Sequence, residues 1–150
     1  MASGHICCLY KGKLLRVQPS NATGTPGSLF NNVILESKMS CNGVWVVEMK
    51  GPYGWERIAT AFMRNGEYLG AGPNHYSLGS YKEDGDNLEM SIRVTPCGAL
   101  RTIFGKKVSE TLHITSKCRI EKDKITGTSS AKGIKKFDVQ LRLARVGNLD

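Results

Sequence analysis

The stretch of residues 63–81 places the strongest constraint on how this chain can fold. Within it, Asn65-Gly66 separates two runs of strand-forming residues. Asn-Gly is the pair best suited to a two-residue hairpin turn, because both turn positions need φ > 0. Glycines and tyrosines are interspersed through the rest of the stretch. This composition is typical of tightly curved strands, since glycine lets a sheet bend while tyrosine fills the space. The stretch therefore predicts a hairpin within a small closed β-barrel.

The chain from Cys41 onward consists of short strand-like runs separated by compact turns, without a helical period. The clearest run is 88–95, where apolar and polar residues alternate with the period of a half-buried strand. Short links between successive strands favour an all-β, antiparallel up-and-down barrel, in which closure removes both exposed edges. We predict eight strands, at about residues 43–49, 57–64, 67–70, 75–82, 88–95, 108–115, 125–129 and 136–143.

Residues 1–40 differ from the rest of the chain. Basic residues at Lys11, Lys13 and Arg16 precede a stretch rich in Pro, Ser, Thr and Gly, and no sustained period is visible. We therefore predict a poorly ordered N-terminal extension over 1–40 and a barrel domain over 41–150. Because Met39 stands just before the first patterned strand, one hypothesis is that the working protein begins there.

Composition narrows the class of protein. The chain has 150 residues, of which 40% are hydrophobic, so one domain can bury a core without disulfides. The net charge of +8 would suit an acidic partner, whether nucleic acid, membrane or protein. The five cysteines show no C-x-x-C spacing, and no apolar run is long enough for a signal peptide or a membrane span. These features predict free thiols and a cytoplasmic protein.

The interior of an eight-stranded barrel is just wide enough to be filled by side chains or to hold one small ligand. The segment Ile103-Phe104 ends the longest connection and is expected to cover one mouth of the barrel. Bulky side chains would either form the core or line a ligand cavity, and both readings stay open. The interior candidates are Trp45, Phe62, Tyr68, Tyr76, Tyr81, Met90 and Phe104.

Six short motifs, mostly turns and strand ends, lie between residues 42 and 146. They are Asn42-Gly43-Val44-Trp45-Val46-Val47-Glu48, Arg64-Asn65-Gly66-Glu67-Tyr68-Leu69-Gly70, Leu78-Gly79-Ser80-Tyr81 with the turn Asp84-Gly85-Asp86, Arg93-Val94-Thr95, Thr102-Ile103-Phe104-Gly105 and Ile125-Thr126-Gly127-Thr128. Through these motifs the chain resembles the GrlR-like family, small barrel proteins named after the negative regulator of the type III secretion locus in attaching-and-effacing enteric bacteria. This resemblance implies a lipocalin-like eight-stranded barrel, a homodimer, a possible apolar occupant, and regulation through binding a transcriptional activator, without catalysis.

The chain departs from the family pattern at the bend after Gly70, and it lacks the acidic surface cluster that is associated with activator binding in the founding regulator. Any specificity of its own is therefore expected at the bend, and a different, acidic partner is expected in place of the activator. Separately, Gly43-x-Trp45 resembles the first-strand motif of lipocalins, in which a late arginine, here Arg142 or Arg145, packs on the indole. The bend candidates for partner binding are Gly72, Pro73, Asn74 and His75.

Several sharper chemical readings are disfavoured. His75 or His113 beside Cys97 or Cys118 would be needed for a nucleophilic pair, but both histidines suit turn or surface positions. A calcium loop and a metal site lack the required spacing. A basic cluster near the last strand has no aromatic platform for nucleic acid. The candidates for the calcium loop are Asp84, Asp86 and Glu89, and those for the metal site are His5, Cys7 and Cys8. The basic cluster consists of Lys132, Lys135, Lys136, Arg142 and Arg145.

The sequence thus predicts a non-enzymatic, cytoplasmic barrel without metal or cofactor. It is expected to act as a regulator by binding a protein partner and to pair as a dimer. The alternative is a small carrier or sensor that holds an apolar ligand inside the barrel. Binding to nucleic acid or to a membrane is not expected.

Overall fold

The computed structural model describes residues 7–10, 13–16, 40–103, 106–134 and 138–149. The chain divides into two compact units, Met1–Leu35 and Glu36–Asp150. In the first unit, β1 (Cys7–Tyr10) and β2 (Lys13–Arg16) form an antiparallel two-stranded sheet. The sequence does not predict these two strands, because four-residue strands are too short to display a period. Met39 and most of the predicted extension lie outside the described residues.

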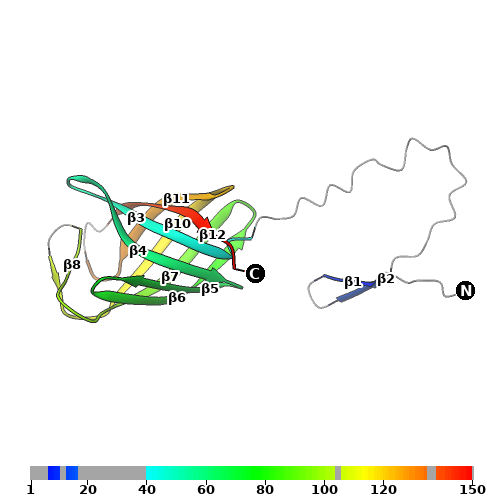
Figure 1. Cartoon of the computed structure of the whole chain (residues 1–150), viewed down its shortest axis with the longest axis horizontal. Coiled ribbons are helices and arrows are strands. Elements are labelled where there is room, and N and C mark those ends of the chain that lie inside the picture. Colours follow the sequence, from blue (N-terminus) through cyan, green and yellow to red (C-terminus); the bar gives the residue numbers. More distant parts are fainter. Residues whose placement is uncertain (1–6, 11–12, 17–39, 104–105, 135–137, 150) are drawn as a thin grey trace, which may run out of the picture. The chain divides into compact units, whose positions relative to one another are not determined.

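The second unit is a closed barrel of eight strands, each antiparallel to its neighbours (Figure 1). Strands follow one another around the barrel in chain order, and the last pairs with the first, so the predicted up-and-down barrel is confirmed. The strands are β3 (Gly43–Gly51), β4 (Gly54–Arg64), β5 (Glu67–Gly72), β6 (His75–Asp84), β7 (Asn87–Pro96), β10 (Leu112–Glu121), β11 (Lys124–Ala131) and β12 (Val139–Gly147).

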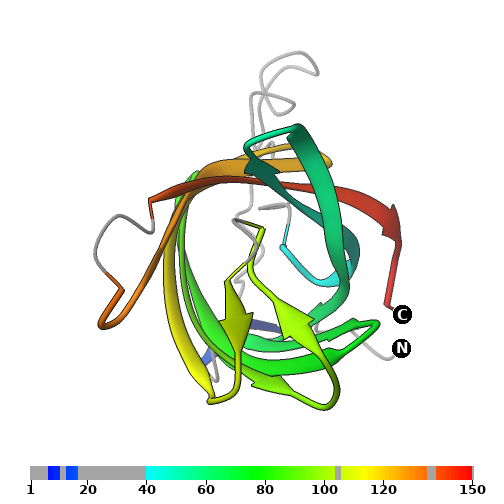
Figure 2. The same ribbon diagram turned by 90° about the vertical axis from the view of Figure 1, so that its left-hand side faces the viewer.

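The longest connection, between β7 and β10, contains a separate two-stranded sheet. It consists of β8 (Leu100–Arg101) and β9 (Lys107–Val108) and lies at one end of the barrel, which Figure 2 views end-on. The predicted strand over 108–115 is therefore divided: Val108 pairs within this small sheet, and the barrel strand begins at Leu112.

The Asn65-Gly66 hairpin forms as expected. Both residues have positive φ, 50° for Asn65 and 86° for Gly66, which is the backbone conformation of a type I′ turn. The carbonyl of Gly66 accepts a hydrogen bond of 2.8 Å from the backbone N–H of Tyr81. A bond therefore ties the turn to the end of β6, two strands further along the barrel.

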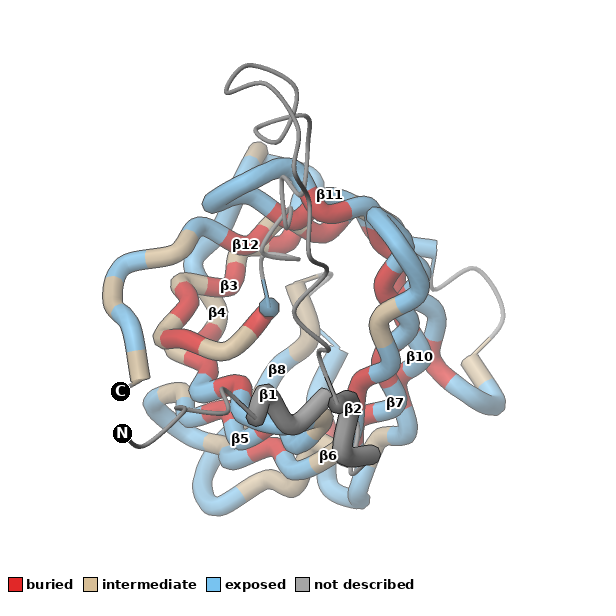
Figure 3. Tube along the Cα trace, turned by 90° about the vertical axis from the view of Figure 1, so that its right-hand side faces the viewer, coloured by how far each residue is buried: buried red, intermediate tan, exposed pale blue. Residues whose placement is uncertain are grey.

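Along each strand, buried and exposed residues alternate, as the alternating colours of Figure 3 show. Apolar side chains from all eight strands meet inside the barrel. At two points the backbones approach too closely for a side chain. A Cβ at Gly79 would lie 2.8 Å from Ile92 Cα, and one at Gly127 would lie 2.6 Å from Cys118 Cα. Glycine is thus required at these two close approaches between neighbouring strands.

Four of the predicted interior residues are buried, namely Trp45, Tyr68, Tyr81 and Met90. The prediction was wrong for Phe62 and Tyr76, which face outward and are exposed by 41% and 43%. The physical reason is parity: Phe62 lies between the inward residues Ala61 and Met63, and Tyr76 precedes the inward residue Ser77, so both aromatic side chains fall on the outer face. The size of these two side chains therefore predicted the wrong face of each strand. Phe104 lies outside the described residues.

One end of the barrel is closed around Trp45, which is fully buried. The Arg145 guanidinium lies over the indole ring, 4.4 Å from its centroid, and the indole N–H donates to the carbonyl of Cys41 at 2.9 Å. Arg145 also donates to the carbonyls of Asn42 and Ser40 and pairs with Asp123. The predicted arginine–indole contact is confirmed with Arg145. Arg142 lies instead over Trp55, 4.2 Å from that ring's centroid.

Candidate functional site

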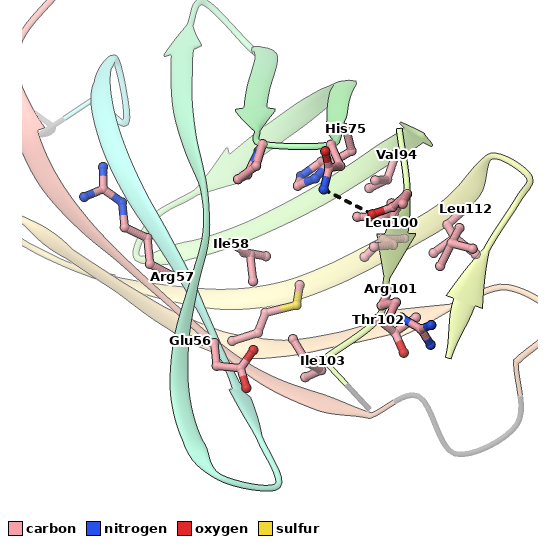
Figure 4. A pocket seen from close by; sticks show the side chains of 16 residues that line it. Glu56, Arg57, Ile58, His75, Val94, Leu100, Arg101, Thr102, Ile103 and Leu112 are labelled. Carbon is pink, nitrogen blue, oxygen red and sulfur yellow. Dashed lines mark hydrogen bonds between the residues drawn. The ribbon is translucent and has the colours of Figure 1, made fainter. Parts of the chain in front are cut away.

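A pocket opens at the end of the barrel opposite Trp45 and has a volume of about 380 Å³. Its walls come from the ends of β3, β4, β7 and β10, from the bend between β5 and β6, and from the connection that contains β8 and β9 (Figure 4). Its apolar lining consists of Met49, Ile58, Pro73, Val94, Ala99, Leu100, Ile103, Val108, Leu112 and Ile114. The other lining residues are polar, and three of them are charged: Glu56, Arg57, Asn74, His75, Arg101 and Thr102. The mouth is therefore a mostly apolar cleft that also carries charged and polar groups.

A β-bulge in β4 shapes this mouth. Val47 is opposite Ala59 and Glu48 is opposite Arg57, so Ile58 is an extra residue in β4. The bulge turns Ile58 toward the pocket (Figure 4). It also shifts the parity of the strand, because beyond it Glu56 shares the inward face with Met49.

The bulge places the neighbouring arginine on the outside. The side chain of Arg57 points away from the pocket in Figure 4 and donates a hydrogen bond of 3.2 Å to Thr60 Oγ1. Without the extra residue, Arg57 and not Glu56 would face inward. The bulge therefore places Glu56, and not Arg57, on the inward face of β4 at the mouth.

A smaller cavity of about 40 Å³ lies deeper in the barrel. Both cavities are lined by Met49, Ile58, His75, Val94 and Ile114, so these residues form the boundary between mouth and interior. None of the residues that line the deeper cavity is an Asp, Glu, Lys or Arg. A molecule that enters from the mouth thus meets charged residues in the mouth pocket and none in the deeper cavity.

His75 is the most unusual polar group of the site. Its Nδ1 atom is buried and has no hydrogen-bond partner among the described residues. Burial lowers the pKa of the imidazole below its ordinary value of 6.5, so the neutral form dominates at pH 7. The ring lies against Gly72, where a Cβ would overlap it and would stand 2.7 Å from the carbonyl oxygen of Ile58.

The deeper cavity carries hydroxyl groups that are paired with one another. Tyr68 and Ser77 share a side-chain hydrogen bond, and burial raises the pKa of Tyr68 to about 12. Ser116 Oγ lies 2.7 Å from Ser129 Oγ, and both serines are buried. Because each hydroxyl has a partner and stays neutral, the interior is polar in places but uncharged.

The bend that the sequence singled out lies at the edge of this pocket. Pro73, Asn74 and His75 line it, and Gly72 supports the His75 ring. Asn74 Nδ2 donates to the carbonyl of Ala99 at 3.1 Å, which ties the bend to the connection that contains β8. The predicted bend thus forms part of the mouth wall.

The interior candidates separate into two groups. Tyr68 and Met90 line the deeper cavity, whereas Trp45 and Tyr81 belong to the closed end. Ile103 lines the mouth, in agreement with the capping role expected for that segment. Sequence reasoning missed Ile58, because a bulge leaves no signature in single-sequence periodicity.

The described residues do not favour nucleophilic or metal chemistry. Among them, no three His, Cys, Asp or Glu side chains lie close enough together to hold a metal ion. Cys41, Cys97 and Cys118 are free thiols, and burial raises the pKa of Cys41 and of Cys118 to about 12. A buried thiol that stays protonated is a poor nucleophile. His113 is exposed on the outer face of β10.

The described part of the chain contains no helix that is long and apolar enough to cross a membrane. Comparison with protein-family models finds no match to this chain, and comparison with curated protein sequences finds no significant match.

Proposed function

We propose that this protein is a non-enzymatic barrel that binds a small, largely apolar molecule in its mouth pocket, as a carrier or sensor. The observation that carries this proposal is the pocket of about 380 Å³ at the open end of the barrel. Small-molecule sites typically have volumes of roughly 300–1,000 Å³ and are lined by apolar side chains with a few polar groups. The mouth pocket matches this description in size and lining.

The arrangement of polar groups supports the same conclusion. His75 stands at the boundary between the two cavities, and its Nδ1 atom has no hydrogen-bond partner in the described part of the chain, while the deeper hydroxyls are already paired. An apolar ligand gains from leaving water at the mouth, and the neutral interior does not require it to carry a charge. The buried thiols, which stay protonated, and the paired hydroxyls favour binding over catalysis.

A pair of variants tests the proposal. Val94 faces both cavities, whereas its neighbour Thr95 lies on the outer side of the same strand, so Val94→Phe fills the pocket and Thr95→Phe is the matched control. The probe is the uncharged dye N-phenylnaphthylamine, followed by fluorescence titration. We expect Val94→Phe to weaken dye binding at least tenfold and Thr95→Phe to leave it nearly unchanged. Equal binding by both variants would reject the mouth as the site.

Native mass spectrometry of protein purified from its host gives the second test. A stoichiometric small molecule in the native protein, absent from Val94→Phe, supports the carrier or sensor. A barrel that is empty in every preparation, together with a co-purifying protein, favours the alternative below.

The alternative function is that of a regulator that binds a protein partner, with the protein itself pairing as a homodimer. Its support is the resemblance to the GrlR-like family together with one structural observation. Large apolar side chains are exposed on the outer face of the barrel, among them Phe62, Leu69 and Leu78. The free thiols fit a cytoplasmic setting for either function.

A further inference from the structure

The exposed apolar side chains on the outer face are adjacent to one another. Phe62 on β4 is opposite Leu69 on β5, and Leu69 is opposite Leu78 on β6. Directly opposed residues of neighbouring strands lie about 4.5–5.5 Å apart at Cβ, so these three side chains form a continuous row across the three strands. They are exposed by 41%, 47% and 42%, which is large for apolar residues.

The row extends beyond these strands. Val44 on β3 is opposite Phe62, and a parallel row contains Val46, Thr60, Ala71 and Tyr76. We call these residues the outer apolar face: Val44, Val46, Thr60, Phe62, Leu69, Ala71, Tyr76 and Leu78. It carries no charged residue, and a contiguous exposed apolar surface of this kind marks an interaction site in a globular protein.

Arginines surround the outer apolar face. Arg93 on β7 is opposite Leu78, Arg57 donates to Thr60 at one border, and Arg64 follows Phe62 by two residues on the same face. Arg57, Arg64 and Arg93 form no ion pair with any described residue. Two carboxylates are in register with these arginines: Glu67 is opposite Arg64, and Glu48 is opposite Arg57 but pairs with Arg142. The border is therefore predominantly basic.

We propose that the outer apolar face is the docking site for an amphipathic, acidic segment of another protein, whose apolar stripe covers Phe62, Leu69 and Leu78 while its carboxylates pair with the arginines. This assignment rests on the partner-binding function proposed above. Aromatic side chains surrounded by arginine are the composition in which binding energy concentrates at protein interfaces. Opposite charge at the border then selects an acidic partner.

Other occupants fit the surface less well. A second copy of the chain would bring the same excess of arginines together at the border. A membrane surface requires side chains that insert roughly 5–10 Å into the lipid, whereas these are more than half covered within a sheet. Nucleic acid would leave the apolar rows unused, because its affinity comes from contacts to phosphate.

Two synthetic peptides test the charge and the apolar surface together. Each forms an amphipathic helix with a leucine stripe, flanked by glutamate in one peptide and by lysine in the other. Binding to the full chain is measured by fluorescence anisotropy at low and moderate salt. We expect the glutamate peptide to bind, to bind more weakly as salt rises, and to bind at least tenfold more tightly than the lysine peptide. Failure of the glutamate peptide to bind, or equal binding of both peptides, would overturn the assignment.

Variants then locate the contact. Leu69→Thr and Leu78→Thr together keep residues that favour strands while removing the apolar row. Thr128→Ser, on the outer side of β11, is the control. We expect the double variant to lose at least tenfold in affinity for the glutamate peptide and Arg93→Ala to lose severalfold, with dye binding at the mouth unchanged. Unchanged affinity in the double variant places the contact elsewhere and refutes the proposal.

Photo-cross-linking in the host separates failure of this assignment from failure of partner binding as such. A benzophenone amino acid replaces Leu69 in one preparation and Thr128 in another, and mass spectrometry identifies the captured segment. An acidic, apolar segment captured from Leu69 supports the proposal, whereas a basic segment, the same chain or lipid overturns it. Capture from Thr128 alone overturns this face and leaves the partner function standing. Capture from neither position overturns both.

Discussion

Gly72→Ala tests how the bend shapes the mouth of the barrel. A Cβ at this position would overlap the His75 ring and would stand 2.7 Å from the carbonyl oxygen of Ile58. The ring can rotate away, but the carbonyl belongs to the backbone of β4 and cannot move without disturbing the bulge. The variant should therefore push His75 into the pocket and strain the bulge.

The magnitude follows from two opposing effects. Overpacking of this kind costs about 1–3 kcal/mol, whereas replacing glycine by alanine gains about 0.4–1 kcal/mol through the unfolded state. We expect a net loss of about 1–2 kcal/mol in the free energy of unfolding, together with at least tenfold weaker dye binding. Urea denaturation and fluorescence titration measure the two quantities.

Gly51→Ala is the matched control for this variant. Gly51 also stands at the mouth, but a Cβ there would meet its nearest neighbours, Glu56 and Ile103, at 3.4 Å. We expect its stability to stay within about 0.5 kcal/mol of the wild type. If Gly72→Ala proves as stable as Gly51→Ala, and binds dye equally well, the packing of His75 against Gly72 does not shape the pocket.

Three further predictions concern the arginines, the pH dependence and the thiols. Arg145→Met should cost about 2–3 kcal/mol of unfolding free energy, because it leaves two carbonyls without their donor. Arg142→Met, at a partly exposed ion pair with Glu48, should cost less than about 1 kcal/mol, and equal losses in urea melts would contradict this. Burial lowers the pKa of His75, so the unfolded chain binds more protons than the folded chain below pH 6.5. The free energy of unfolding should therefore fall as the pH drops through that value. His75→Gln should reduce this fall in melts recorded between pH 7.5 and roughly 5.5. Iodoacetamide at about pH 8 should label the exposed Cys97 in the native protein, but it should label the buried Cys118 only after unfolding. Peptide mass mapping measures both, and rapid labelling of Cys118 in the native protein would mean that the barrel opens there.

Short-range patterns in the sequence predicted most of the fold. Asn65-Gly66 forms the expected hairpin because positive φ at both positions is a local property of those residues. The alternation through β7 likewise located a barrel strand, since one buried and one exposed face impose a period of two. Even the arginine over Trp45 was foreseen as one of two candidates, and the structure selected Arg145.

The candidate site was only partly predictable. The bend from Gly72 to His75 was recognised because it departs from a family pattern, and it does line the mouth pocket. The outward positions of Phe62 and Tyr76 were missed, because side-chain size was used to assign the face of the strand and the parity of the strand was not. The size of a side chain does not report which face of a strand it lies on.

The sequence by itself determined the turns, the alternation and hence a closed barrel, because these depend on backbone preferences and on neighbours a few residues apart. Only the tertiary structure decided that the barrel has one closed and one open end. The closed end depends on Arg145 reaching Trp45 and residues near Ser40, which are about a hundred positions away in the chain. The open end depends on the Ile58 bulge, which exists only in the pairing of β3 with β4. Contacts between distant segments therefore produced the closed end and the pocket.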